Sequence, residues 1–218
     1  MRAYWQQENN FGDKLTPYLV KKLVGRDCIL KKTPGKLLGV GSILHWAMEG
    51  DTIWGSGLIS PRHLPKSNKL NVLALRGPMT ADILSKLGVD TKNCIYGDPG
   101  LLLSRVYKPR VSIEYPIGIV PHYVDVEIAK KEYPNCHLID VTLPIEKFID
   151  EINKCGRILS SSLHGLVTAD SYGIPNDRMV LSNNLMGGNF KFLDYYLGKN
   201  RFKAEQMIAR LNSYVSTL

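Results

Sequence analysis

The chain has 218 residues, 44% of them hydrophobic and 22% charged, and this composition excludes disordered and collagen-like proteins. Its net charge of +8 favours acidic partners, namely phosphorylated metabolites, nucleic acid or an anionic membrane face, against the alternative of a basic protein without such a partner. The four cysteines form no CxxC pair, and no apolar run is typical of a signal peptide or a membrane span. We therefore expect free thiols, no zinc site and a cytoplasmic protein.

The first half of the chain alternates between strand-like and helix-like segments. Residues 14–25 place leucines at helical spacing and end at a glycine, whereas residues 71–75 are apolar in the manner of a buried strand. Pro78 suits the first turn of the helix that follows, which ends at Gly88. Further strands are predicted at residues 2–6, 36–44, 51–59 and 93–96.

A basic, proline-containing segment at residues 104–116 interrupts this alternation, and we interpret it as the link between two lobes. The predicted domains are therefore an N-terminal lobe at 1–105, a linker at 106–116 and a C-terminal lobe at 117–218. The second lobe has predicted strands at 117–122, 136–141, 157–161 and 178–182, predicted helices at 124–133, 144–155 and 163–173, and a closing helix at 201–218. This alternation predicts an α/β fold with parallel sheets built from βαβ units.

Ligands of open parallel sheets bind beyond the carboxyl ends of the strands. In this sequence the loops at those ends are rich in Gly, Asp, Ser, His and Arg. The candidate loops are residues 9–13, 55–57, 76–77, 97–100, 121–122 and 160–164.

Three serines and a histidine, Ser160, Ser161, Ser162 and His164, lie where a predicted strand meets a helix. Because a helix N-terminus offers N–H groups and partial positive charge, the serines can bind a phosphate or carboxylate, or one of them can cap the helix. His164, in the first turn, can act as a general acid or base near neutral pH, or it fills the corner between strand and helix.

Four other polar residues follow predicted strands or precede helices. The planar guanidinium of Arg76 suits a carboxylate or phosphate, and the alternative is a surface arginine on a turn. His122 has the same two interpretations as His164. Asp13 is a polar site residue or the N-cap of the following helix, and Asp98 is a site residue or a turn former.

Two glycine loops, residues 39–41 and 55–57, lack the third glycine of GxGxxG, so we interpret them as turns that allow a close approach of the backbone. DxD, HExxH and P-loop motifs are absent from the sequence, which gives no support to metal-nucleotide or ATP chemistry. Lysines and arginines are scattered over the predicted helices without interleaved aromatic residues, so no nucleic-acid partner is expected.

Seven segments, in order and across nearly the whole chain, carry a resemblance to a known family. They are NFGD (10–13), GSGLI (55–59), LRGPMTADIL (75–84), YGDPGLLL (96–103), IGIVPHYVD (117–125), SSSLHGLVTADSYGIP (160–175) and GGNFKFLDYY (187–196). Together they resemble the polysaccharide pyruvyl transferase family, in particular its bacterial exopolysaccharide ketal-pyruvate transferases. Each segment alone is weakly specific, whereas the ordered set is specific.

The resemblance implies a GT-B-like fold, in which two compact Rossmann-type lobes surround a cleft. It implies the transfer of a pyruvyl group from phosphoenolpyruvate to two hydroxyls of one sugar, forming a ketal and releasing phosphate. It implies no metal and no cofactor beyond this donor substrate. His164 would be the catalytic acid or base. The contacts to phosphoenolpyruvate would be Arg76, Ser160, Ser161 and Ser162.

One position departs from the family pattern. Many members have Arg-Leu-His where this chain has Ser-Leu-His at 162–164, and the change removes an expected anion contact. Either Ser161 and Ser162 with the helix N-terminus replace this contact, or a distant cation, Arg178 or Lys191, does so. The remaining predicted contacts, to the sugar or in the cleft, are Asn10, Asp13, Gly55, Ser56, Gly57, Asp98 and His122.

The function predicted on these grounds is pyruvyl transfer to a polysaccharide or a lipid-linked glycan precursor in exopolysaccharide or capsule synthesis. The acceptor would lie at the inner face of the plasma membrane, which the protein would contact peripherally. Two alternatives remain. One is a GT-B-like glycosyltransferase that uses a nucleotide sugar, and the other is a non-catalytic protein that binds a phosphorylated ligand.

Overall fold

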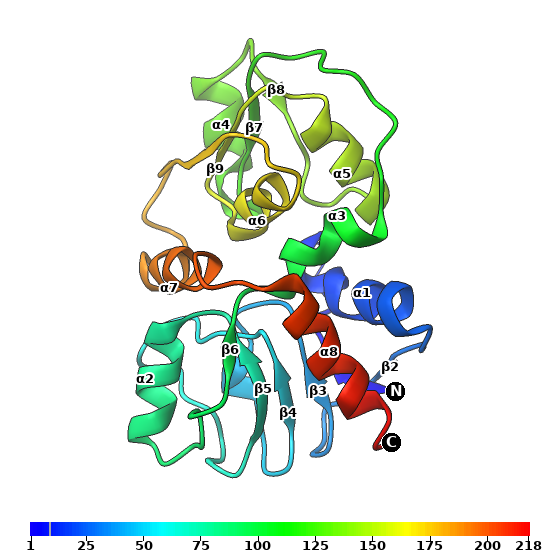
Figure 1. The fold of residues 1–218 in the computed structure, drawn as a ribbon. Helices are drawn as coiled ribbons and strands as arrows, with labels where there is room; N and C mark the ends of the chain where they lie inside the picture. Colours follow the sequence, from blue (N-terminus) through cyan, green and yellow to red (C-terminus); the bar gives the residue numbers. More distant parts are fainter. Residues whose placement is uncertain (9) are drawn as a thin grey trace. The chain divides into compact units, whose positions relative to one another are not determined.

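The computed structural model describes residues 1–8 and 10–218, so Asn9, which belongs to one of the candidate loops, lies outside the described residues. The chain divides into two compact units, each with its own sheet (Figure 1). Unit 1 consists of Met1–Gln7, Asp13–Pro99 and Gly187–Leu218, and unit 2 consists of Glu8–Gly12 and Gly100–Met186.

Unit 1 contains a six-stranded sheet in which all pairs are parallel and the strand order is β2-β1-β3-β4-β5-β6. The strands are β1 (Arg2–Tyr4), β2 (Ile29–Leu30), β3 (Leu37–Leu38), β4 (Thr52–Trp54), β5 (Asn71–Leu75) and β6 (Ile95–Tyr96). Leu37, Leu38 and Ile53 of the central strands are fully buried. Such continuous apolar burial is expected of a parallel sheet that is covered on both faces.

Helices cover this sheet on both sides (Figure 1). They are α1 (Leu15–Val24), α2 (Pro78–Lys86), α7 (Phe190–Lys199) and α8 (Ala204–Val215), with the short 3-10 helices η1 (Gly12–Lys14) and η2 (Leu44–Trp46). α1 buries its apolar face and ends at Gly25, whose φ of 68° is the left-handed conformation that favours glycine at this position. The indole N–H of Trp54 donates to the carbonyl of Met207 in α8 (3.0 Å), which fixes α8 against β4.

Unit 2 contains a four-stranded parallel sheet with the order β10-β9-β7-β8. The strands are β7 (Gly118–Val120), β8 (His137–Leu138), β9 (Ile158–Ser160) and β10 (Asn176–Arg178). The helices are α3 (Leu103–Val106), α4 (Val126–Glu132), α5 (Ile145–Asn153) and α6 (Leu163–Ser171), with η3 (Pro99–Leu102) and η4 (Tyr123–Asp125). α5 buries Phe148, Ile149 and Ile152, the apolar stripe that its sequence predicts.

The unit boundaries differ from the domain boundaries predicted from the sequence. The segment at 106–116 belongs to unit 2 rather than forming a linker, because Tyr107 Oη donates to Asp150 (2.9 Å) and the N–H of Tyr115 donates to the carbonyl of Lys154 (3.0 Å). The closing helix belongs to unit 1, where Met207 lies in the core beside β4. A break in periodicity marks the end of regular structure, whereas tertiary contacts decide which unit a segment joins.

The predicted fold class is confirmed: both sheets are purely parallel, and helices alternate with strands as in Rossmann-like folds. Within residues 1–8 and 10–218, no helix is long and apolar enough to cross a membrane. Cys28, Cys94, Cys136 and Cys155 are free thiols. Burial, together with the charges of Glu151 and Glu114, raises the pKa of Cys155 to about 11, so this thiol stays protonated at neutral pH.

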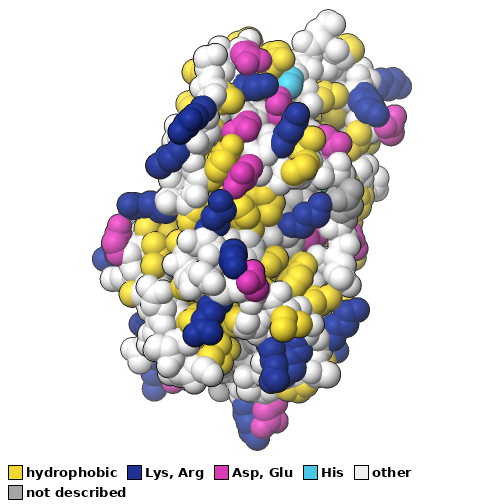
Figure 2. Space-filling model, turned by 90° about the vertical axis from the view of Figure 1, so that its right-hand side faces the viewer, with side chains coloured by type: hydrophobic (Ala, Val, Ile, Leu, Met, Phe, Trp, Pro, Cys, Tyr) yellow, Lys and Arg dark blue, Asp and Glu magenta, His cyan; other side chains and the backbone are white. Residues whose placement is uncertain are grey.

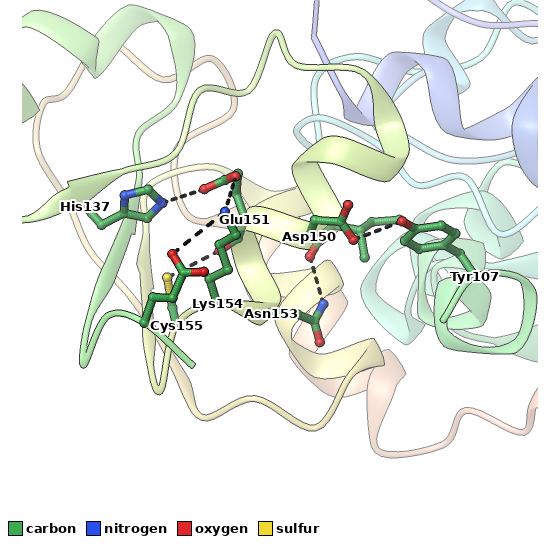
Figure 3. A network of polar contacts seen from close by, with 9 residues as sticks. Tyr107, His137, Asp150, Glu151, Asn153, Lys154 and Cys155 are labelled. Atoms are coloured by element: carbon green, nitrogen blue, oxygen red, sulfur yellow. Dashed lines mark hydrogen bonds and ion pairs between the residues drawn. The ribbon is translucent and has the colours of Figure 1, made fainter. Parts of the chain in front are cut away.

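A polar network lies at the amino end of the unit 2 strands (Figure 3). His137, at the start of β8, stacks on the ring of Tyr115 (centroids 3.8 Å apart), and its Nε2 lies 2.9 Å from a carboxylate oxygen of Glu151. The ammonium of Lys154 donates to the other oxygen of Glu151 (3.1 Å). Because this end of a parallel sheet is opposite the ligand-binding end, we assign the network a structural role.

Glu151→Gln is expected to weaken the acid sensitivity of folding. Burial alone would raise the pKa of Glu151, but the hydrogen bonds and charges of Lys154 and His137 outweigh it and hold this pKa below its ordinary value of 4.5. A carboxyl group whose pKa is lowered by folding stabilises the protein above its unfolded pKa, and this stabilisation is lost as pH falls through the folded pKa. We expect the urea concentration at which half of the wild-type protein is unfolded to decrease as the pH is lowered below about 4.5. In Glu151→Gln this concentration should depend less on pH.

Glu127→Gln is the matched control for this measurement. Glu127 pairs with Lys130 at an exposed site (2.8 Å), where an ion pair contributes little. The variant Glu127→Gln should therefore show the same difference as the wild type between the urea midpoints at pH 7 and at about pH 3.5, the range in which carboxyl groups titrate. A full wild-type difference in Glu151→Gln would show that the network does not set the acid stability.

Candidate functional site

The carboxyl ends of three neighbouring strands in unit 2 bring together several of the candidate residues. In the parallel register Val120 of β7 lies beside Ser160 of β9, and Ser160 lies beside Arg178 of β10. β7 continues into His122, and β9 continues into the first turn of α6 with His164. This edge is where parallel α/β sheets bind ligands.

Two of the three serines hold this edge together through their hydroxyl groups. Ser160 Oγ donates to backbone carbonyls of the edge and accepts from the N–H of Ser162 (3.0 Å). Ser161 Oγ donates to Asp125 (2.7 Å) and accepts from the N–H of His122 (2.9 Å). Both serines are buried, so the structure makes them positioning residues for the loops, while their contact with phosphoenolpyruvate stays a prediction.

Ser162 occupies the N-cap position of α6 with an extended backbone (φ −93°, ψ 131°), but its hydroxyl makes no capping hydrogen bond. Helix capping by its side chain therefore does not explain this serine. The first N–H groups of α6 lie next to the strand ends of the sheet, where the helix dipole favours an anion.

Asp125 is a residue of this edge that the sequence reasoning missed. It is fully buried, and its two carboxylate oxygens accept from the hydroxyls of Ser161 and Ser182. It thereby ties the loop after β7 to the loop after β9 and to the segment that follows β10. The available signal was an acidic residue three positions after His122 in a strand-end loop, which by itself is not distinguishable from a turn former.

His164 is half-buried in the first turn of α6 and packs against the backbone of Gly12. A Cβ atom on Gly12 would lie 2.0 Å from His164 Nδ1, so only glycine leaves room for the imidazole. Asn10 Oδ1 accepts from the N–H of Gly12 (2.9 Å) and fixes the turn beside the ring. Two segments that the sequence selected separately, around residues 10–12 and 160–164, therefore meet at His164.

Phe11 explains why the segment at residues 10–12 joins unit 2. Its N–H donates to the carbonyl of Val141 (2.6 Å), and its buried ring stacks on Phe148 of α5 with centroids 4.1 Å apart. The hydrophobic contact of Phe11 thus holds Asn10 and Gly12 against the carboxyl edge of the sheet.

Gly12→Ala is expected to destabilise the protein by about 1–3 kcal/mol, because the new methyl group overlaps the imidazole of His164. Gly12 does not have a positive φ, so the substitution adds no backbone strain of its own. In a His164→Ala background most of this loss should disappear, since the overlapping ring is gone. The measurement is a double-mutant cycle from urea unfolding, and equal losses in both backgrounds would contradict the contact.

His122 is the second histidine of this edge. It is half-buried, its ring lies 4.3 Å from that of the exposed Tyr123, and its Nδ1 lies 3.5 Å from the N–H nitrogen of Val124. Its backbone N–H donates to Ser161, so both histidines are held at strand ends of the same sheet. Its predicted role at the sugar stays a prediction.

The two cations considered as replacements for the missing family arginine have different surroundings. Arg178, at the end of β10, is half-buried and lies level with Ser160 at the carboxyl edge of unit 2. Lys191 belongs to α7 of unit 1, where it is largely buried and lies 5.5 Å from the ring centroid of Phe192. Arg178 is therefore the cation that shares an edge with the loop of His164.

Arg76 is fully buried in unit 1, so the alternative of a surface arginine on a turn is wrong, while its contact with phosphoenolpyruvate stays a prediction. Its Nε donates to Asp194 of α7 (3.1 Å), and its Nη2 lies 3.0 Å from the same carboxylate oxygen. Nη1 donates to Ser42 Oγ (2.6 Å), and Nη2 donates to the carbonyl of Leu58 (2.6 Å). Asp194 also accepts from the N–H (2.9 Å) and hydroxyl (2.7 Å) of Thr80 at the start of α2. Arg76 and Asp194 thus join the end of β5, the start of α2 and α7.

The remaining unit 1 candidates support the same region of the fold. Ser56 is buried and donates to the carbonyl of Gly39, and Gly57 packs against the guanidinium of Arg76. Asp98 is fully buried in its Gly-Asp-Pro turn.

Gly55 has a φ of +89°, and a Cβ there would lie 2.3 Å from Pro99 Cδ, so glycine is required. Asp13 lies in η1 and is not the N-cap of α1, because Lys14 holds that position without a side-chain bond, so the capping alternative for Asp13 is wrong. Among the residues that the structure describes, no group of three or more His, Cys, Asp or Glu side chains is arranged to hold a metal ion.

A family model described as polysaccharide pyruvyl transferase matches residues 60–176, which is more than half of the chain and includes both strand-end histidines. The chain belongs to the polysaccharide pyruvyl transferase family. The predicted family is thereby confirmed. No solved structure gives a significant match to the chain.

Two curated relatives of this pyruvyl transferase family member align with most of its length. It is 30% identical over 210 residues to the uncharacterized protein L143 of Acanthamoeba polyphaga mimivirus, an alignment that covers 88% of this chain and 71% of that protein. It is 27% identical over 208 residues to the succinoglycan biosynthesis protein ExoV of Rhizobium meliloti (strain 1021), covering 88% of this chain and 62% of that protein. The chain therefore spans less than two thirds of the second relative.

Proposed function

We propose that this protein transfers a pyruvyl group from phosphoenolpyruvate to two hydroxyls of a sugar, forming a cyclic ketal and releasing phosphate. The observation that carries this proposal is the position of His164 in a chain of this family. It stands at the N-terminus of a helix, at the carboxyl edge of a parallel sheet, and packs against Gly12 of the segment at 10–13. A histidine there can exchange protons near neutral pH next to a place suited to an anion.

The reaction requires one proton to be delivered and two to be removed. Protonation of the methylene carbon of phosphoenolpyruvate gives a methyl group and makes C2 electrophilic, and the first sugar hydroxyl bonds to C2 as it loses its proton. The second hydroxyl then bonds to C2 while the C2–O bond to phosphate breaks, and the proton of this hydroxyl leaves on the released phosphate. His164 would donate the first proton and accept one from a hydroxyl, with the N-terminal N–H groups of α6 facing the negative charge of the donor.

Arg178 is the residue that we propose as the cationic partner of the donor phosphate or carboxylate. Arg178→Ala should raise the KM for phosphoenolpyruvate by about tenfold or more, because a charge-assisted hydrogen bond contributes about 1.5–3 kcal/mol. Arg157→Ala is the matched control, since Arg157 is exposed just before β9 and pairs with Asp177, the neighbour of Arg178 in β10. An unchanged KM in Arg178→Ala would leave Ser162 and the helix N-terminus as the anion contacts.

The acceptor that we propose is a polysaccharide or its lipid-linked precursor at the inner face of the plasma membrane. The relative ExoV is named for the biosynthesis of succinoglycan, an acceptor class that agrees with this proposal. A surplus of positive charge also agrees with acidic partners such as phosphoenolpyruvate and an anionic membrane.

One experiment distinguishes this function from its alternatives. The protein is incubated with phosphoenolpyruvate and a panel of synthetic or lipid-linked sugars, and phosphate release and the mass of each sugar are measured. We expect phosphate release that depends on the sugar, with a matching gain of one pyruvyl group. A hexose gained from a nucleotide sugar without use of phosphoenolpyruvate would indicate a glycosyltransferase. Binding of phosphoenolpyruvate without any product would indicate a non-catalytic protein.

A further inference from the structure

The net positive charge of the chain comes entirely from unit 1. Unit 1 contains 19 Lys and Arg against 9 Asp and Glu, a net charge of +10, whereas unit 2 contains 9 against 11, a net charge of −2. A small anionic substrate requires a few cations at its site, and Arg76, Lys36 and Lys191 of unit 1 are buried. The exposed surplus of unit 1 is therefore larger than a substrate of this size explains.

Part of this surplus is concentrated in one short segment, residues 21–32, which we call the basic edge. It comprises the last turn of α1, the turn at Gly25 and the edge strand β2. Its cations are Lys21, Lys22, Arg26, Lys31 and Lys32. Its acidic residue, Asp27, pairs with Lys21 (2.8 Å), with both side chains more than half exposed. Arg2, which is exposed and in register with Ile29, adds a further cation from β1.

The basic edge also exposes apolar surface. Ile29 of β2 is 70% exposed in the middle of the cationic segment, and Tyr18 of α1 lies beneath the ammonium of Lys22 (5.4 Å to the ring centroid). Figure 2 shows the side of the molecule on which α1, β2 and α8 lie in Figure 1, and Lys and Arg side chains are interspersed there with hydrophobic and acidic ones. An exposed branched aliphatic side chain within a cationic segment is suited to the boundary between lipid headgroups and acyl chains.

We propose that the basic edge binds the surface of an anionic lipid bilayer, with Ile29 entering the headgroup layer. A cluster of four to eight Lys and Arg residues is the number that anionic membranes attract, and each cation near the surface strengthens binding about fivefold. The contact is reversible and sensitive to salt, because exposed charges are screened within about 10 Å at 0.1 M ionic strength.

Protection of the sheet edge and binding of nucleic acid are two further roles that a basic edge can have. Lysines beside an edge strand prevent strands of other molecules from pairing with it, but one or two charges suffice for this, and it does not require an exposed isoleucine. A nucleic acid would engage the cations through its phosphates, but it would leave the aliphatic side chain of Ile29 without a role. Membrane binding uses both the cations and Ile29, and it does not rest on the proposed pyruvyl transfer.

The test is sedimentation with sucrose-loaded vesicles of phosphatidylcholine alone or with about 30% phosphatidylserine, a fraction that creates the anionic surface potential. We expect the wild-type protein to bind only the anionic vesicles and to dissociate as salt is raised from about 0.1 to 0.5 M. The triple variant Lys22→Glu, Arg26→Glu, Lys32→Glu should bind more than about tenfold more weakly. Ile29→Ser should bind several-fold more weakly with an unchanged salt dependence.

The matched control is the triple variant Arg62→Glu, Lys92→Glu, Lys203→Glu, which makes the same charge change at exposed positions elsewhere in unit 1. It should bind within about twofold of the wild type, and circular dichroism verifies that all variants are folded. The proposal is overturned if the wild type ignores anionic vesicles or if both triple variants lose binding equally. It is also overturned if a single-stranded oligonucleotide binds the basic edge while vesicles do not. Because the readout is lipid binding, failure of pyruvyl transfer would leave the result unaffected.

Discussion

His164→Ala is expected to lower the turnover of pyruvyl transfer by about 10²–10⁴-fold while the protein stays folded, because positioned general acid–base catalysis contributes rate factors of this size. The side chain is half-buried and packs against the backbone of Gly12, so its removal leaves the core of unit 2 intact. The measurement combines steady-state kinetics with phosphoenolpyruvate and a urea unfolding curve. A variant with nearly wild-type turnover would remove His164 from the mechanism.

Two further variants separate chemistry from packing at this position. His164→Gln retains polarity and most of the volume but cannot exchange a proton near neutral pH, so it should be as inactive as His164→Ala. His122→Ala is the matched control, a half-buried histidine that follows another strand of the same sheet. His122→Ala should lose less turnover than His164→Ala. If the two variants lose equal turnover, both histidines take part in the proton transfers, and each variant should change the pH profile of kcat.

Arg76→Ala is expected to destabilise the protein by about 3–5 kcal/mol, because it leaves the carboxylate of Asp194 buried without its cation. Asp194→Ala should cost a similar amount, since it removes the acceptor of Arg76 and of Thr80 together. Both values come from urea unfolding at neutral pH. A loss below about 1 kcal/mol would show that the ion pair does not hold α7 against β5.

The geometry of the glycines supports this large effect. A Cβ atom on Gly77 would lie 1.8 Å from the carbonyl oxygen of Asp194, and one on Gly198 would lie 1.9 Å from the carbonyl oxygen of Arg76. The backbone of α7 therefore touches the turn between β5 and α2 directly, with no room for relaxation around the ion pair. Because close-packed interiors relax little, the loss of one partner should not be compensated by movement of the other.

Two comparisons make this prediction specific. Lys86→Ala removes an exposed ion pair with Asp82 (2.7 Å) in α2 and should cost no more than about 0.5 kcal/mol. The double variant Arg76→Met, Asp194→Leu should recover much of the stability lost by either single alanine, because an apolar pair leaves no uncompensated charge. If the double variant is as unstable as the sum of the single variants, packing rather than charge explains the loss.

The sequence predicted the type of most elements and a set of candidate loops for the site. Alternating strand and helix patterns led to parallel sheets. The rule that ligands bind at carboxyl ends of strands selected six loops, at residues 9–13, 55–57, 76–77, 97–100, 121–122 and 160–164. These features are local in the chain, since periodicity, capping residues and turn residues act over a few positions. The ordered motifs likewise led to the family that the comparison confirms.

Only the tertiary structure decided which candidates meet and which are structural. The sequence around Arg76 is compatible both with an exposed arginine on a turn and with one buried against Asp194. The structure decides between them, because Asp194 is 118 positions away in the chain. The contact of His164 with Gly12 and the hydrogen bond from Ser161 to Asp125 also join distant parts of the chain, so no local sequence pattern predicts them. Periodicity shows which side of an element is buried but not what covers it. That choice depends on long-range packing, which brought residues 10–12 to His164 and α8 to the first sheet.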